Sequence, residues 1–221
     1  MNKCVVFNIS GSYGRFRKPY TTTSALSFIT IHPIAVKGII GAIVGIDKDE
    51  LYGWAKDIKI GIEVINPIKK DMQSFNLNNM KTNGTFRFPS NVEFLRDLKY
   101  RIYVTGDKVN ELEKVLLEEE FVFTPYLGVS EHMAKVAYEY TKEDMEHICE
   151  GHWVDTLIPM DNIDLDFQCE YEINTDNIPV KNNEKREYTK YEKIVFTTEE
   201  KKLKGKIKEV YKVGDKHVFF F

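Results

Sequence analysis

A basic and aromatic segment near the N-terminus holds the side chains of this chain that are best suited to binding an anionic polymer. Arginines alternate in it with aromatic rings, and hydroxyl side chains follow, in the run Gly11-Ser12-Tyr13-Gly14-Arg15-Phe16-Arg17-Lys18-Pro19-Tyr20-Thr21-Thr22-Thr23. Guanidinium groups bind phosphates, rings stack on bases, and hydroxyl groups bond to backbone oxygens. The pattern indicates a nucleic-acid interface, and the alternative is an ordinary solvated basic loop after a strand.

The distribution of charge along the chain favours the first interpretation. The whole chain carries a formal charge of −3, yet its first 46 residues include no acidic side chain and carry +5. Residues 102–180 carry −15, and residues 181–221 return to +5. Proteins that bind nucleic acids usually concentrate positive charge in such a patch. The opposite blocks suggest one face for a polyanion and another that is turned toward solvent or a basic neighbour.

Three residues in the second half of the chain raise the question of a metal site. They are His147, Cys149 and His152. Structural zinc takes four ligands, usually in closely spaced pairs, and the fourth is missing here unless His132 or Cys169 approaches. We therefore predict a polar cluster, with no metal and no other cofactor. The sequence also lacks the GxxxxGK[ST] run of nucleotide-hydrolysing proteins.

The composition is that of a soluble globular protein. The 221 residues, of which 43% are hydrophobic and 29% charged, suffice for one core with a smaller appendage. No apolar run approaches the roughly 20 residues of a membrane span, and the N-terminus lacks the pattern of a signal peptide. Three cysteines without a CxxC pair, Cys4, Cys149 and Cys169, favour a reducing compartment. We expect a cytoplasmic protein that does not contact a membrane.

The spacing of apolar residues predicts the elements that must position the basic segment. Strands are predicted at residues 3–10, 57–65, 100–105 and 120–127, and helices at residues 34–46, 49–56 and 107–119. The order βαββαβ of the main elements is that of a ferredoxin-like fold, the scaffold of RNA-recognition (RRM) domains. The helix at 34–46 is apolar almost all round, and Gly38, Gly41 and Gly45 on it predict a close approach of helix and sheet.

Two further regions complete the predicted organisation. Residues 66–98 show no sustained periodicity, but Phe86 and Phe88 on either side of Arg87 indicate a hairpin rather than a flexible linker. Beyond Gly128 the pattern predicts strands at residues 134–141, 152–158, 163–172, 191–197, 207–213 and 216–221. We therefore predict an α+β protein with a body at residues 1–128, which contains an insertion at about 66–98, and a β-rich C-terminal part at residues 129–221.

Four blocks of the sequence together resemble the Cas-five family of CRISPR-associated proteins, within the RAMP superfamily. In chain order they are GSYGRFRKPYTTTSALSF, PIAVKGIIGAIVGI, FTPYLGVSEH and WVDTLIPM. The resemblance runs across essentially the whole chain and is nearest to the variant of subtype I-B systems. It implies a ferredoxin-like (RRM-like) body, a β-hairpin thumb inserted between strands two and three, and a β-rich C-terminal part.

The resemblance also implies a function and a set of partners. Such proteins are subunits of the Cascade surveillance complex and cap one end of the crRNA by gripping its 5′ handle. The implied partners are the crRNA 5′ handle, the Cas-seven type backbone subunit, the large Cascade subunit and, through the complex, target DNA. Guide pairing rather than this subunit would supply sequence specificity toward DNA.

With this function implied, the RNA-binding residues are assigned by their chemistry. Phosphate contacts are assigned to Arg15, Arg17 and Lys18, stacking or packing to Tyr13, Phe16 and Tyr20, hydroxyl contacts to Thr21, Thr22 and Thr23, close main-chain approach to Gly11 and Gly14, and thumb contacts to Lys81 and Arg87. A position in the core is the alternative for Phe16.

The remaining question is whether the chain cleaves RNA. One branch of the family processes its own precursor crRNA without a metal and uses a tyrosine with an adjacent Lys–His pair. Here the adjacent pair is Lys216-His217, which lies elsewhere in the sequence, and His132 has no partner at acid–base spacing. We predict a non-catalytic subunit, with a metal-independent endoribonuclease that processes pre-crRNA as the alternative.

Overall fold

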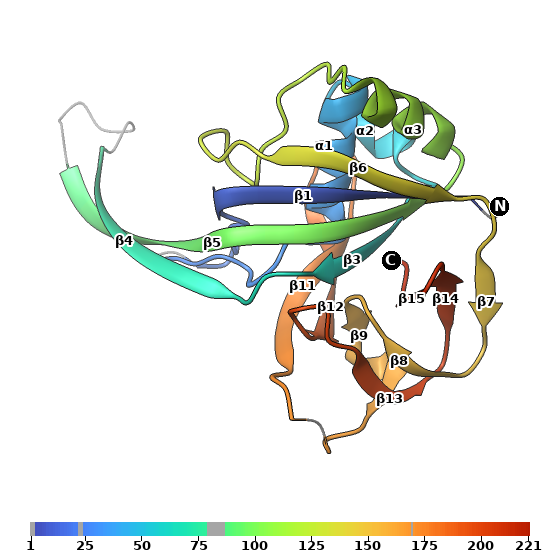
Figure 1. Ribbon diagram of the computed structural model, residues 1–221. Helices are drawn as coiled ribbons and strands as arrows, with labels where there is room; N and C mark the ends of the chain where they lie inside the picture. The colour runs from blue at the N-terminus through green and yellow to red at the C-terminus, as the bar shows by residue number, and fades with distance from the viewer. Residues whose placement is uncertain (1–2, 22–23, 79–86, 169) are drawn as a thin grey trace.

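The computed structural model describes residues 3–21, 24–78, 87–168 and 170–221 (Figure 1). These residues form an α+β structure that consists mainly of strands, as the sequence predicts. Helices cover one face of a curved sheet (Figure 1). In the C-terminal part, Ile178, Ile194 and Phe196 join the core on this face, whereas Val213 and Val218 pack on the opposite face.

Four antiparallel strands form the centre of the body. They are β1 (Cys4–Gly14), β3 (Lys59–Val64), β5 (Arg87–Thr105) and β6 (Lys135–Lys142), and they lie side by side in the order β3-β5-β1-β6. Successive side chains of a strand point to opposite faces, so Val5, Phe7 and Ile9 enter the core beneath the helices while Asn8 and Ser10 occupy the other face.

Three helices cover the core face of this sheet. They are α1 (Pro33–Val44), α2 (Leu51–Trp54) and α3 (Val109–Glu118). The first helix begins with Pro33, whose fixed φ suits the first turn, and the Nδ1 atom of His32 accepts a hydrogen bond from the Ala35 N–H at 3.2 Å. It ends at Gly45, whose left-handed φ of 90° forms the C-cap.

The glycines of α1 do not serve the close helix–sheet contact that the sequence suggests. A Cβ atom at Gly38 would meet nothing within 4 Å, whereas one at Gly41 would lie 2.6 Å from Cδ1 of Leu51. Gly41 therefore allows close packing against α2 rather than the sheet, and Gly45 is needed for its backbone conformation.

The prediction of a strand at residues 120–127 is wrong. This segment runs irregularly over the C-terminal end of α1, where Val122 N–H donates to the Ile43 carbonyl at 3.2 Å and Phe123 N–H to the Ala42 carbonyl at 2.9 Å. These bonds satisfy carbonyls that the helix end leaves open, and Pro125 has no N–H to give to a ladder. The strand that pairs with the outer edge of β1 is instead β6, which follows this segment in the chain.

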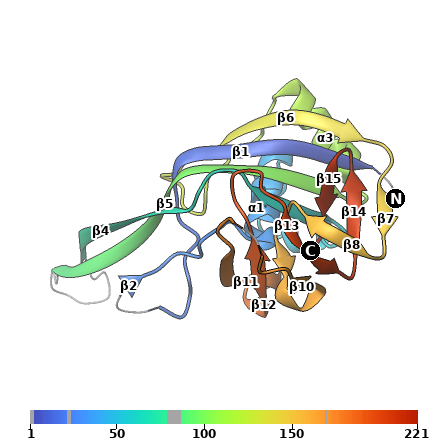
Figure 2. The same ribbon diagram turned by 60° about the horizontal axis from the view of Figure 1, so that its bottom comes forward.

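A long hairpin occupies much of the segment at 66–98. Strand β4 (Lys69–Asn78) pairs with the first half of β5, and the hairpin extends well beyond the helices (Figure 1). On the other edge of β5, the two-residue strand β2 (Ser24–Ala25) pairs in parallel, so the chain after β1 runs next to the hairpin (Figure 2).

The described C-terminal part contains three small antiparallel sheets. The first has β8 (Gly151–Val154), β10 (Ile163–Leu165) and β13 (Leu203–Ile207), the second has β9 (Ile158–Pro159), β11 (Asn174–Asn182) and β12 (Tyr188–Phe196), and the third has β7 (Glu146–Ile148), β14 (Val210–Val213) and β15 (Lys216–Val218). A short 3-10 helix, Met160–Asn162, joins β9 to β10. The sequence does not predict β7, β11 or all but the last residue of β13. Strand β7 is very short, β11 is polar and contains a proline, and β13 contains two lysines and a glycine.

A buried polar network attaches the C-terminal part to the sheet. Glu63 on β3 is only 1% exposed, and its carboxylate accepts hydrogen bonds from Arg101 at 3.0 Å, Tyr103 at 2.8 Å and Lys216 at 2.8 Å. The backbones of Ile60 and Phe221 exchange two further hydrogen bonds, at 3.2 and 3.0 Å. The last residues of the chain are therefore joined to the edge of the body.

Candidate nucleic-acid interface

The basic segment that the sequence singles out leaves the sheet at the end of β1 and folds back on itself. Phe28 N–H donates to the Phe16 carbonyl at 2.8 Å, and Lys18 N–H donates to the Leu26 carbonyl at 2.9 Å. The hydroxyl of Ser27 accepts from the Phe16 N–H at 3.0 Å. The loop is therefore held in one conformation on both sides of its tip. Thr22 and Thr23, two of the predicted contacts, lie outside the described residues.

Arg15 and Arg17 form the cationic part of this segment. Arg17 is exposed and Arg15 is half-buried, and the intervening Phe16 points inward. Burial lowers the pKa of Arg15, and the nearby charge of Arg17 lowers it further. Neither guanidinium forms an ion pair with the described residues, and the buried Nε of Arg15 has no hydrogen-bond partner among them. Two neighbouring cations without a counter-ion favour the binding of an anion.

Phe16 and Lys18 contribute to the fold rather than to the predicted RNA contacts. Phe16 is 3% exposed and belongs to the main core. The ammonium of Lys18 lies 2.8 Å from Oδ1 of Asp176, and both side chains of this pair are mostly buried. Lys18 also lies over the ring of Phe28, 5.3 Å from its centroid. Its charge is thus neutralised inside the protein.

The glycines of the segment are explained by packing within the protein. A Cβ atom at Gly11 would come within 2.5 Å of Cδ1 of Leu127, and one at Gly14 within 2.4 Å of Cδ1 of Leu98. At both positions the space beside the glycine is filled by a leucine side chain and is not open to a ligand. The prediction that these glycines allow the main chain to approach RNA is therefore corrected, since they allow close packing within the protein.

Tyr20 and Thr21 differ in how open they are to a ligand. The hydroxyl of Thr21 donates to the Lys18 carbonyl at 2.9 Å and accepts from the Leu26 N–H at 3.3 Å, so the turn itself uses it. Tyr20 is 59% exposed, and its ring is free to stack on a base.

An aromatic row continues from the segment onto the hairpin. The ring of Phe94 makes edge contacts with Tyr13, His132 and Phe75, at centroid distances of 6.3, 5.3 and 5.9 Å. Phe75 is 39% exposed and offers part of its ring to a ligand. Arg87 is exposed at the far end of the described hairpin, and Lys81 lies outside the described residues.

A surface hollow beside Arg17 contains functional candidates that the sequence does not reveal. Its lining residues are Arg17, Pro19, Arg186, Glu187, Tyr188 and Tyr191. Burial raises the pKa of both tyrosines, so their hydroxyls stay protonated at neutral pH. In the sequence, only the positive charge of residues 181–221 indicates that this region could bind an anion. No spacing in the sequence shows that the turn after β11 lies next to the N-terminal segment.

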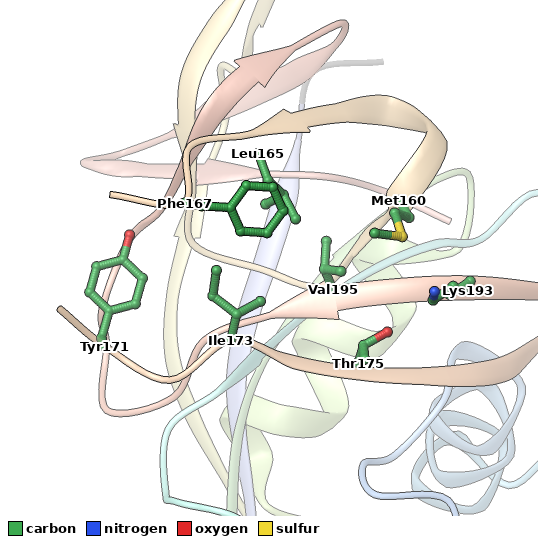
Figure 3. A pocket seen from close by; sticks show the side chains of 8 residues that line it. All are labelled: Met160, Leu165, Phe167, Tyr171, Ile173, Thr175, Lys193 and Val195. Atoms are coloured by element: carbon green, nitrogen blue, oxygen red, sulfur yellow. The ribbon is translucent and has the colours of Figure 1, made fainter. Parts of the chain in front are cut away.

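A second hollow, of about 390 Å³, lies in the C-terminal part (Figure 3). It is lined by Met160, Leu165, Phe167, Tyr171, Ile173, Thr175, Lys193 and Val195. Phe167 at its rim is 76% exposed. Because Lys193 is the one cation in this lining, the hollow suits an apolar group better than a phosphate.

The Lys216-His217 pair is held in the interior. Burial opposes the charge of Lys216, but its hydrogen bond to Glu63 and the charges of Glu63 and Asp155 together outweigh this and raise the pKa of the lysine. Burial, and then the charge of Glu63, raise the pKa of Tyr103 far above its usual value. His217 stacks on Trp153 with their centroids 4.2 Å apart. A partly buried lysine that stays charged and a buried tyrosine that stays protonated are poorly suited to withdraw a proton from RNA.

The described residues contain neither a metal cluster nor a membrane span. Sγ of Cys149 lies 3.8 Å from Nδ1 of His147, but no group of three or more described His, Cys, Asp or Glu side chains could hold an ion. Cys169 lies outside these residues. None of the described helices combines the length and the apolar character needed to cross a membrane.

Comparison with protein families matches residues 4–194 to the family described as CRISPR-associated protein (Cas_Cas5), the Cas-five family. No curated protein matches the chain. A crystal structure of a CRISPR protein from Archaeoglobus fulgidus is 12% identical, with a TM-score of 0.56 over 98% of this chain and 97% of that one. A chain of a CRISPR RNA-guided surveillance complex is 10% identical, with a TM-score of 0.55 over 92% and 90%. At these identities the two structures share the fold with this chain.

Proposed function

The chain belongs to the Cas-five family of CRISPR-associated proteins, and from this premise we propose that it is a non-catalytic, crRNA-binding subunit of a type I CRISPR surveillance complex. In this proposal it holds the 5′ handle of the crRNA in the cytoplasm and caps one end of the backbone filament. The observation that carries the proposal is the pair of guanidiniums of Arg15 and Arg17, which lack counter-ions among the described residues and lie on a rigid loop.

The shared fold supports a place in a multi-subunit complex. The matching chain of the RNA-guided surveillance complex resembles this protein over nearly its whole length. The partners in our proposal are the crRNA handle, a Cas-seven type backbone subunit, the large subunit and, through the complex, target DNA. The subtype I-B assignment rests on the sequence blocks alone.

We also propose that the body is ferredoxin-like and that the β4–β5 hairpin is its thumb. The strand order β3-β5-β1-β6, with α1 between β1 and β3 and α3 between β5 and β6, supports this assignment. The exposed Phe75 and Arg87 make the hairpin suitable for contacts with RNA or the backbone subunit.

A ribonuclease is the alternative function, and the surroundings of its candidate catalytic residues argue against it. Tyr103 and Lys216, a tyrosine and the lysine of a Lys–His pair, do bond to the same Glu63, and the backbone N–H of His217 bonds to Asp155. Their burial and their bonds to protein groups leave no open site for a scissile phosphate around them.

The test is one gel that reports both binding and cleavage. The purified chain is incubated in EDTA with labelled repeat RNA from its own CRISPR locus. We expect retardation of the 5′ handle without cleavage, and loss of retardation for the double variant Arg15→Gln, Arg17→Gln. Specific cutting at the base of the repeat hairpin would establish the nuclease instead, and absence of binding would contradict both functions.

A further inference from the structure

The hollow beside Arg17 is assembled from two parts of the chain that lie far apart in sequence. Arg17 and Pro19 come from the N-terminal segment, whereas Arg186, Tyr188 and Tyr191 come from the β11–β12 turn and from β12. Its volume is about 570 Å³, within the usual range of about 300 to 1,000 Å³ for small-ligand sites. Both cationic and aromatic surfaces therefore face one space.

The turn that carries Arg186 is built rigidly. Asn183 Nδ2 donates to Oε2 of Glu187 at 2.8 Å, and the Glu187 N–H donates back to Asn183 Oδ1 at 2.9 Å. Between them, Arg186 adopts a left-handed backbone with a φ of 64°. A residue with a Cβ atom is strained there, and such strain is common where a side chain must be aimed at a ligand.

The charges around the hollow leave its two guanidiniums without partners in the protein. Neither Arg17 nor Arg186 forms an ion pair with any described residue. The one carboxylate in the lining, Glu187, is bonded to Asn183. The charge of Arg17 lowers the pKa of the nearby Arg15, so positive charge continues beyond the hollow.

A buried histidine fixes the hydroxyl of Tyr188. Nδ1 of His32 accepts from the Ala35 N–H, so the neutral ring must carry its proton on Nε2. That Nε2 lies 3.4 Å from the Tyr188 hydroxyl and donates to its oxygen. This contact holds the ring of Tyr188 in place at the wall of the hollow.

The aromatic surface of the hollow is a corner. The rings of Tyr188 and Tyr191 meet at 89°, with centroids 6.0 Å apart, and Tyr20 lies near Tyr191. Because the hydroxyl of Tyr188 is held at His32, the corner keeps its shape without a ligand. A flat base can stack on such a preformed surface at little entropic cost.

We propose that this hollow binds one nucleotide of the RNA, with a phosphate between Arg17 and Arg186 and the base on Tyr191. The inference rests on the proposed function, since it names the place where the chain grips its RNA. It adds the β11–β12 turn to an interface that the N-terminal segment alone was expected to form.

The test measures RNA affinity of the full chain by fluorescence anisotropy with a labelled single-stranded RNA of the 5′ handle sequence, across about 50 to 300 mM salt. Arg186→Gln should weaken binding roughly tenfold and reduce the salt slope by about 0.7, the value for one lost phosphate contact on a single strand. Tyr191→Leu should weaken binding roughly tenfold and leave the slope unchanged, because it removes stacking and no charge.

Lys185→Gln is the matched control, since Lys185 is exposed in the same turn and does not line the hollow. It should bind within about twofold of the wild type, and circular dichroism should show all variants folded. If Arg186→Gln matches Lys185→Gln in affinity and salt slope while the wild type binds the RNA, the hollow is not the nucleotide site. The proposed RNA-binding function is then retained. If the wild type itself fails to bind the RNA, the proposed function and the hollow are both overturned.

Discussion

Single residues of the N-terminal segment divide between the core and the surface in a way that residue type alone does not reveal. Arg15 and Arg17 keep their charges near the surface, as their type suggests, while Phe16 and Lys18 are used by the fold. The sequence predicts the first pair because arginines in an acid-free stretch have no local partner. It misses the ion pair of Lys18 because its partner, Asp176, is far away in the chain.

Lys18 provides a residue-scale prediction that separates stability from binding. Lys18→Met should lower the free energy of unfolding by about 2 kcal/mol, because it leaves the largely buried carboxylate of Asp176 without its cation. Arg17→Gln, on the exposed neighbour, should leave stability within about 0.5 kcal/mol of the wild type. Urea unfolding of both variants measures the difference. Equal stability of the two would show that the Lys18 ion pair does not support the fold.

His32 provides a prediction about pH. Burial lowers the pKa of His32 from 6.5 to about 3. The unfolded chain binds a proton at this histidine below about pH 6.5, whereas the folded chain does so only near pH 3, so stability falls as the pH is lowered between these values. The loss attributable to His32 should reach about 2 kcal/mol between pH 7.5 and pH 5.

The control for His32 retains the cap and removes the titration. Asn is among the best N-cap residues, so His32→Asn should keep α1 capped. Chemical unfolding at the two pH values should show a clearly smaller decrease for this variant than for the wild type. The same decrease in both proteins would mean that other groups, such as the half-buried His132, govern the acid sensitivity.

At the scale of elements, strong local patterns were predictable and pairings between distant segments were not. The apolar run of α1, the alternation of β3 and the amphipathic pattern of α3 fix these elements locally. The segment at 120–127 reads as a strand because it is aromatic and β-branched. In the structure those residues instead close the end of α1, a role that only the tertiary arrangement defines. Likewise, β11 forms because β12 lies beside it.

Two glycines show by mutation where the packing of the elements requires a glycine and where it does not. Gly38→Ala should stabilise the protein by about 0.5 to 1 kcal/mol, because a Cβ atom there meets open space and alanine favours a helix. Gly128→Ala should destabilise it by about 3 kcal/mol or more, since φ is 86° and the Cβ atom would collide with the Arg15 carbonyl. Thermal unfolding of the two variants checks both signs, and a destabilised Gly38→Ala would mean that α1 contacts another surface at that position.

The hairpin can be shortened without disturbing its register. Ser74 and Asn91 face each other, so an Asn-Gly turn can replace residues 75–90. We expect a folded protein with a melting temperature within a few degrees of the wild type, because the described residues among those removed, 75–78 and 87–90, belong to the hairpin beyond the body. Co-purification with the backbone subunit of the same locus should be lost. A molten product, or undiminished co-purification, would contradict the assignment of the hairpin as a thumb.

At the scale of the whole molecule, the RNA-binding hollow requires the body and the C-terminal part to keep a fixed relation. Its residues come from both, and the core of the body itself includes Ile178, Ile194 and Phe196 of β11 and β12. The network around Glu63 makes a second connection on the opposite face of the sheet. The two parts should therefore unfold together rather than as independent domains.

Glu63 tests this coupling. Glu63→Gln should lower the free energy of unfolding by about 3 kcal/mol, because Arg101 and Lys216 would then lose the buried charge that they share. Glu200→Gln is the matched control, since Glu200 contacts the same Arg101 from an exposed position and should cost less than about 1 kcal/mol. Urea unfolding followed at tryptophan, with Trp54 in the body and Trp153 in the C-terminal part, and by circular dichroism should give coincident single transitions for wild type and both variants. Two separated transitions in the wild type would show that the parts fold independently, and the hollow would then depend on RNA to bring its two halves together.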